Sequence, residues 1–97
     1  MNITKCRVLK TETVLSDGIS YTYSLIENYN RLLSSFGIPL YSIEIRMIFD
    51  DTGEMTENKS DALFSDIDKA SDFFNKLVRN LATPIDLPYI VEDELYK

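Results

Sequence analysis

The chain has 97 residues, of which 44% are hydrophobic and 27% are charged, a composition typical of one globular domain over residues 1–97. Its net charge is −6 and its basic residues form no cluster, so nucleic acid is not an expected partner. No apolar run is long enough for a signal peptide or a membrane span, so we expect no membrane partner either.

The cysteine content indicates a reducing compartment. Cys6 is the only cysteine, so no disulfide can form within the chain, whereas small secreted domains usually carry several. We therefore expect a cytoplasmic protein. Within the fold, Cys6 is expected to be a small buried apolar residue of the first strand.

The first half of the chain predicts an antiparallel sheet. Ile3 to Val14 is expected to be an edge strand, and Ile19 to Glu27 a second strand that follows the turn residues Asp17-Gly18. Leu40 to Phe49 is the clearest strand, because apolar residues alternate with mostly polar ones along it. This alternation predicts a sheet with one covered face and one wet face.

The connections between these strands are harder to assign. Asn28 to Pro39 is predicted to be a structured connection, either irregular or with one or two helical turns. Asp50 to Gly53 has turn chemistry, and the polar stretch from Glu54 to Asp61 reads as a mobile loop or a ragged hairpin. Ala62 to Phe64 is the expected short fourth strand.

The main helix is predicted over Asp66 to Leu81, with Ser65 as its N-cap. Its apolar residues recur at helical spacing and should pack on the apolar face of the third strand. The residues of this stripe are Ile67, Ala70, Phe73, Phe74, Leu77, Val78 and Leu81, and we expect Phe73, Phe74 and Leu77 to be buried against Ile43, Ile45 and Met47.

A second, short helix is predicted from the N-cap Asp86 to Leu95, with Pro88 in its first turn. Acidic residues near its C-terminal end oppose the helix dipole, so this helix needs a surface to dock on. The expected fold is therefore α+β: an antiparallel sheet of three to four strands, one amphipathic helix packed on one face and a short C-terminal helix.

Several short stretches resemble a domain-of-unknown-function family of short proteins from Gram-positive spore-forming bacteria. They are Ser65-Asp66-Ile67, Thr83-Pro84-Ile85-Asp86-Leu87 and Val91-Glu92-Asp93-Glu94-Leu95, with further similarity at Tyr21-Thr22-Tyr23 and Phe36-Gly37-Ile38. The chain departs from the family pattern at Asp86, where the family suggests His, and at Glu94, where it suggests an aromatic residue. The resemblance implies a cytoplasmic bacterial protein and implies no activity.

The residue inventory gives no catalytic site, cofactor site or metal site. The chain has no histidine, which excludes Ser-His and Cys-His nucleophilic systems and histidine-ligated metals. Its few glycines lie far apart, so there is no phosphate-binding or dinucleotide-binding loop. The carboxylates between Asp50 and Glu57 do not follow the ligand spacing of a calcium loop. We therefore expect no catalysis and no cofactor.

Two functional hypotheses remain. The first is a non-catalytic protein-interaction or regulatory module that binds a protein partner or self-associates as a homodimer. Its candidate interaction surface lies on the acidic and apolar C-terminal helix: Leu87, Val91, Glu92, Asp93, Glu94 and Leu95. The alternative is a small-ligand-binding sensor domain, with a cavity between sheet and helix lined by Tyr21, Tyr23 and Tyr41.

Overall fold

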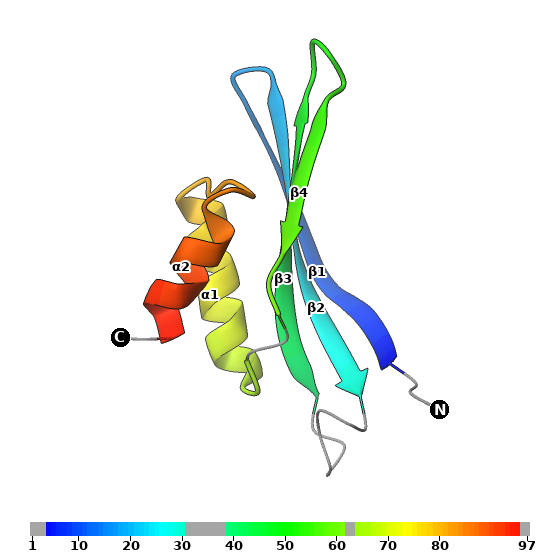
Figure 1. Cartoon of the computed structure of the whole chain (residues 1–97), viewed down its shortest axis with the longest axis vertical. Helices are drawn as coiled ribbons and strands as arrows, with labels where there is room; N and C mark the ends of the chain where they lie inside the picture. The colour runs from blue at the N-terminus through cyan, green and yellow to red at the C-terminus, as the bar shows by residue number, and fades with distance from the viewer. Residues whose placement is uncertain (1–3, 31–38, 62–63, 96–97) are drawn as a thin grey trace.

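The computed structural model describes residues 4–30, 39–61 and 64–95. Within them the elements in chain order are β1 (Thr4–Ser16), β2 (Ile19–Asn30), β3 (Leu40–Phe49), β4 (Met55–Lys59), α1 (Ile67–Arg79) and α2 (Leu87–Leu95). The strands form one antiparallel sheet in the order β1-β2-β3-β4, and both helices lie on the same side of it (Figure 1). The α+β fold predicted from the sequence is confirmed.

The β1–β2 hairpin turns at the two residues that the sequence marks as a turn. Asp17 and Gly18 both have positive φ angles, 52° and 74°, as a two-residue hairpin loop that follows the strand twist requires. The ladder continues to the far end of both strands, with a register shift between Val8 and Lys10. β2 reaches Asn30, so the start of the predicted connection from Asn28 to Pro39 is strand. Residues 31–38 lie outside the described residues.

The fourth strand is not where the sequence analysis placed it. β4 runs over Met55–Lys59, in the stretch expected to be a loop or ragged hairpin, and pairs antiparallel with β3. Of the predicted strand Ala62 to Phe64, Phe64 forms an isolated bridge with Tyr41, and residues 62–63 lie outside the described residues. The charged side chains of β4 concealed the strand, because at a sheet edge they remain in water.

The N-cap of α1 is Asp66, not the predicted Ser65. Asp66 has extended backbone angles, and its Oδ1 accepts hydrogen bonds from the backbone N–H groups of Asp68 at 2.8 Å and Lys69 at 3.4 Å. Both residues can cap a helix, and the carboxylate adds a favourable charge at the positive end of the helix dipole. Ile67 therefore opens the helix and is 39% exposed, although the periodicity had placed it on the buried stripe.

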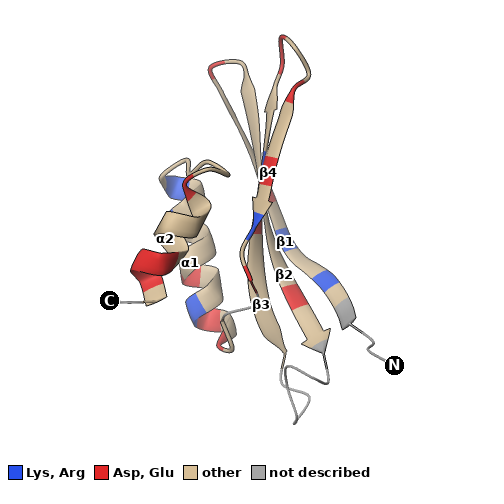
Figure 2. Ribbon diagram, in the orientation of Figure 1, with Lys and Arg blue, Asp and Glu red and all other residues tan. Residues whose placement is uncertain are grey.

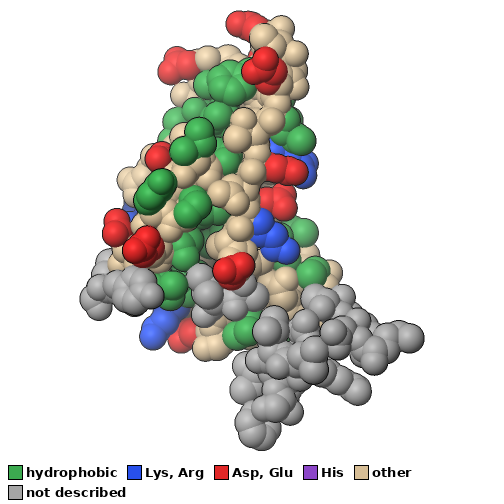
Figure 3. All heavy atoms as spheres, in the orientation of Figure 1, with side chains coloured by type: hydrophobic (Ala, Val, Ile, Leu, Met, Phe, Trp, Pro, Cys, Tyr) green, Lys and Arg blue, Asp and Glu red, His purple; other side chains and the backbone are tan. Residues whose placement is uncertain are grey.

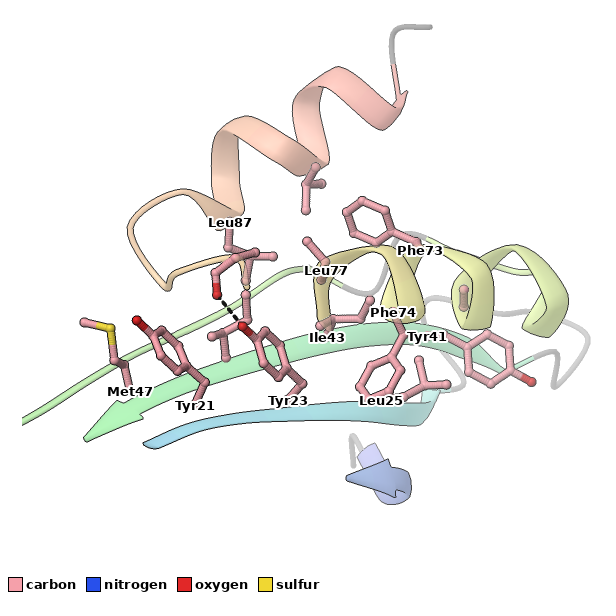
Figure 4. Packing of buried hydrophobic residues seen from close by; sticks show 14 residues of the cluster. Tyr21, Tyr23, Leu25, Tyr41, Ile43, Met47, Phe73, Phe74, Leu77 and Leu87 are labelled. Atoms are coloured by element: carbon pink, nitrogen blue, oxygen red, sulfur yellow. Dashed lines mark hydrogen bonds between the residues drawn. The ribbon is translucent and has the colours of Figure 1, made fainter. Parts of the chain in front are cut away.

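The core lies between the sheet and the helices (Figure 4). Phe73, Phe74 and Leu77 of α1 are at most 2% exposed, which confirms the predicted buried face of the helix. α2 also contributes to this core. The buried apolar residues are Tyr21, Tyr23, Leu25, Tyr41, Ile43, Ile45, Met47, Ala70, Phe73, Phe74, Leu77, Ala82, Leu87 and Val91.

The prediction that Cys6 is buried is wrong. Cys6 is exposed, because its strand position places it on the side away from the helices. Its Sγ donates a hydrogen bond to Oδ1 of Asn28 at 3.2 Å, and Nδ2 of Asn28 donates to Oγ of Ser42 at 3.0 Å. Asn28 and Ser42 are both buried, so this polar network satisfies side chains that water cannot reach.

Candidate docking groove between β4 and α2

α2 is capped at its start and joined to α1 near its end. Asp86 precedes the helix and its carbonyl accepts the N–H of Ile90 at 3.0 Å, while its carboxylate accepts the hydroxyl of Thr83 at 2.8 Å. Near the other end, Nζ of Lys76 lies 3.5 Å from a carboxylate oxygen of Glu94. These contacts hold a short helix whose own charges do not favour it.

The predicted interaction surface divides into two parts in the structure. Leu87 and Val91 are 1% and 7% exposed, so they cover the protein's own core. Glu94 is half-buried beside Lys76. The remaining members of the predicted surface, Glu92, Asp93 and Leu95, are exposed.

A groove of about 210 Å³ separates α2 from the end of β4. Asn58, Lys59, Ser60 and Asp61 form its polar wall, and the other wall is apolar. The residues of that apolar wall are Leu87, Pro88 and Val91 of α2. The outer rims of the buried Leu87 and Val91 thus remain open to this groove although most of each side chain lies in the core.

The wall formed by β4 is held in place by hydrogen bonds to its neighbours. Nδ2 of Asn58 donates to the carbonyl of Pro84 at 3.2 Å, which links the strand to the segment that precedes α2. Oγ of Ser60 accepts the N–H of Ile43 at 2.9 Å, and the N–H of Ser60 donates to the carbonyl of Ile43 at 2.8 Å. The groove therefore has one wall fixed to the sheet and one fixed to the helices.

β4 is also an open edge of the sheet. In an antiparallel ladder alternate residues direct both backbone groups to one neighbour. Hydrogen bonds at Ser60 and Glu54 show that the even-numbered residues of this stretch face β3. The backbone groups of Met55, Glu57 and Lys59 consequently point away from the sheet. This edge borders the groove.

The surroundings of the groove are mainly acidic. Asp61 lies in its wall, and Glu92 is one helical turn beyond Pro88 on the same side of α2. Figure 2 shows the acidic end of α2 and the acidic hairpin tips, and Figure 3 shows hydrophobic side chains over α2 with acidic side chains around them. Leu95 follows Val91 by one turn and is 47% exposed, so the apolar strip continues along the helix.

A second depression lies on the opposite edge of the sheet, beside β1. Cys6, Arg7, Glu27 and Tyr29 line it, and Arg7 forms an ion pair with Glu27 at 3.1 Å. Glu27 also accepts a hydrogen bond from the hydroxyl of Tyr41 at 3.5 Å. Burial, and then the charge of Glu27, raise the pKa of Tyr41. No residue of α1 or α2 lines this depression, and its two charged side chains pair with each other.

The tyrosines proposed to line a ligand cavity are part of the packed core. Tyr21, Tyr23 and Tyr41 are at most 8% exposed, and none of them lines either of the two pockets described above. The hydroxyl of Tyr23 donates to the carbonyl of Ala82 at 2.8 Å, as Figure 4 shows with a dashed line. No contact of these tyrosines favours the small-ligand alternative.

The described residues hold no group of three or more His, Cys, Asp or Glu side chains that could bind a metal ion. Among the same residues, neither helix is long and apolar enough to cross a membrane. The expectations that the chain uses no metal, no cofactor and no catalysis therefore stay predictions.

Sequence reasoning missed most residues of the groove. The predicted interaction surface included Leu87 and Val91 of the groove. It did not include Pro88 or the wall from Asn58 to Asp61. A usable signal was present: a turn with Gly53 directly after a long strand predicts that the chain returns alongside that strand.

Comparison with known families gives one match over nearly the whole chain. A family model described as "Family of unknown function (DUF6514)" matches residues 3–97. No curated protein and no solved structure matches the chain.

Proposed function

The chain belongs to this family of unknown function, DUF6514, and from its surfaces we propose that it is a non-catalytic protein-interaction module whose docking site is the groove between β4 and α2. One observation carries the proposal: an open strand edge and an apolar helix wall face each other across the same groove. Open edges and apolar grooves are the two features that proteins most often use to bind segments of other proteins. The single free cysteine supports placing this function in the cytoplasm.

The rest of the molecule supports docking rather than chemistry. The ionisable residues that line the groove, Lys59 and Asp61, are both exposed to solvent. Beside the groove, α2 carries the exposed apolar side chains Tyr89 and Leu95, and apolar side chains that gather at a surface are a feature of binding sites.

The proposal can be tested with two neighbouring substitutions that change the charge equally. Pro88 lines the groove, whereas Tyr89 is 68% exposed and does not line it. We expect that the tagged wild-type chain and Tyr89→Lys retain the same partner protein from native cells. Pro88→Lys should lose that partner, because the new side chain places bulk and charge at the groove. Circular dichroism of the purified variants checks that α2 stays folded.

Loss of the partner in Tyr89→Lys with retention in Pro88→Lys would move the docking surface to the outer side of α2 and contradict the proposal. Retention in both variants would likewise exclude the groove. If the wild-type chain retains no protein above the level of a tag-only control, the interaction function itself fails.

A further inference from the structure

The groove also indicates what kind of segment fits it. We infer that the occupant is an extended, basic segment of a partner protein, which pairs with β4 as a fifth strand and places apolar side chains against α2. This inference rests on the proposed function and adds the chemistry and the conformation of the bound segment.

The backbone of β4 can pair with one further strand. The N–H and C=O of Glu57 point away from β3, so the pairing of β4 with β3 does not use them. The next outward N–H, that of Lys59, is already occupied: it donates to Oδ1 of Asn58 at 2.9 Å. Asn58 thus shields one end of the edge, and Glu57 offers the hydrogen-bonding pair that an added strand needs.

The side chains of a strand added beside β4 would alternate between the two faces of the sheet. Because side chains alternate along a strand, those of Met55, Glu57 and Lys59 lie on the sheet face away from the helices. Lys59 therefore lines the groove with its main chain. A strand added beside β4 would direct every second side chain to the helix side, where Leu87 and Val91 lie. Apolar side chains at these positions would contact the apolar wall.

The size of the groove favours this occupant over a small molecule. Its volume is about 210 Å³, below the roughly 300–1,000 Å³ of pockets that enclose drug-sized ligands. An extended chain needs no deep pocket, since its backbone gives affinity along the edge and only single side chains enter the groove.

The charge of the surroundings selects a basic segment. Asp61 and Glu92 lie beside the groove, and the side chain of Lys59 belongs to the other face of the sheet. Residues 50–97 contain most of the acidic residues of a chain with net charge −6. Opposite charges on a partner would speed association and fix its register, and acidic segments would be repelled.

The other open edge, β1, does not offer the same site. It has an irregularity between Val8 and Lys10, and Arg7 and Lys10 are exposed along it. Bulges and basic residues are the features by which proteins protect sheet edges from pairing. The pocket beside β1 is lined by Cys6, Arg7, Glu27 and Tyr29, and no residue of α2 is among them.

The test uses a blocked peptide of alternating lysine and valine and the isotope-labelled full chain. We expect binding that slows hydrogen exchange of the Glu57 amide and leaves the Thr13 amide of β1 unchanged. A matched peptide with glutamate in place of lysine should bind at least about tenfold more weakly. Methylation of alternate peptide nitrogens should also abolish binding, because it removes strand hydrogen bonds and keeps the charge.

Two variants at one position separate backbone pairing from charge. Glu57→Pro removes the outward N–H without removing a bond to β3, as edge positions tolerate proline. Both substitutions remove the exposed ion pair between Glu57 and Arg46, which is 3.2 Å long, but Glu57→Gln keeps the outward N–H. We expect Glu57→Pro to weaken peptide binding about tenfold or more, the effect of losing strand hydrogen bonds, and Glu57→Gln to bind like the wild type.

The inference is overturned if the Glu57→Pro chain binds the lysine-valine peptide as tightly as the wild type does, or if the wild type does not bind this peptide. It is also overturned if the glutamate peptide binds as tightly as the lysine peptide, because the occupant is then not basic. These results leave the proposed function standing if Pro88→Lys still loses the partner from native cells. The two claims can therefore fail separately.

Discussion

Tyr23 shows how one residue joins the sheet to the end of α1. Its ring is fully buried in the core, and its hydroxyl donates to the carbonyl of Ala82 just beyond the helix. Burial, followed by the charge of Tyr21, raises the pKa of Tyr23 to about 12. The neutral phenol is therefore part of the folded structure.

The raised pKa predicts a loss of stability in alkali. An unfolded tyrosine ionises near its ordinary pKa of 10.0, so the full contribution of Tyr23 is present below that value and is lost as the pH rises toward 12. The fall amounts to about 2–3 kcal/mol over this interval. Denaturant unfolding between pH 8 and about pH 11 checks this and should show about half of that fall, roughly 1.4 kcal/mol, with Tyr23→Phe as the matched variant.

Tyr23→Phe should be about 1–2 kcal/mol less stable than the wild type near neutral pH, because the carbonyl of Ala82 loses its partner. It should also lose a smaller fraction of its stability in alkali. The same alkaline loss in both chains would show that Tyr23 is not the group responsible.

Residue-scale features were predictable where packing alone decides them. The burial of Phe73, Phe74 and Leu77 follows from helical periodicity, and the structure confirms it. Cys6 and Asp66 were assigned wrongly for different reasons. The face on which Cys6 lies depends on strand register, and Ser65 and Asp66 are both good caps, so the sequence could not choose between them.

At the scale of elements, α2 is a helix that depends on its docking surface. Its buried residues, Leu87 and Val91, join the core formed by α1 and the sheet. Each such side chain contributes roughly 1.5–3 kcal/mol when removed from water. α2 therefore stabilises the protein and, with its other side, forms the apolar wall of the groove.

Removal of residues 86–97 should uncover apolar surface on α1, chiefly around Leu77. We expect the truncated chain to melt at a lower temperature and to bind a hydrophobic dye, while its circular dichroism keeps the sheet signal. A chain that lacks only residues 95–97 serves as the control and should resemble the wild type. An unchanged melting temperature in the longer truncation would show that α2 does not cover the core.

The two elements that form the groove differed in how well the sequence predicted them. α2 was found because Asp86, Pro88 and the apolar spacing all indicate the same helix. The stretch that holds β4 was predicted only as a loop or a ragged hairpin, because its residues, with Glu57 and Lys59 among them, have the composition of a loop. The groove needs both elements, so its position could not be derived before the return of the chain beside β3 was known.

At the scale of the whole molecule, the helices are placed unevenly over the sheet. α1 contacts β2 and β3, and α2 lies on the β4 side, so both α2 and β4 are nearest the viewer in Figure 1. The sheet thus ends at β4 beside a helix wall, whereas β1 lies at the other edge. A strand added beside β4 would therefore lie next to α2.

The measurement that tests the central claim most directly is site-specific photo-crosslinking in native cells. A photoreactive amino acid is placed at Pro88 in the groove and, in separate strains, at Thr22 on the helix-free face of the sheet and at Arg7 beside the β1 pocket. The account predicts that illumination joins one partner protein to the chain from Pro88 and from neither control position. A partner joined from Thr22 or Arg7 and not from Pro88 would contradict it.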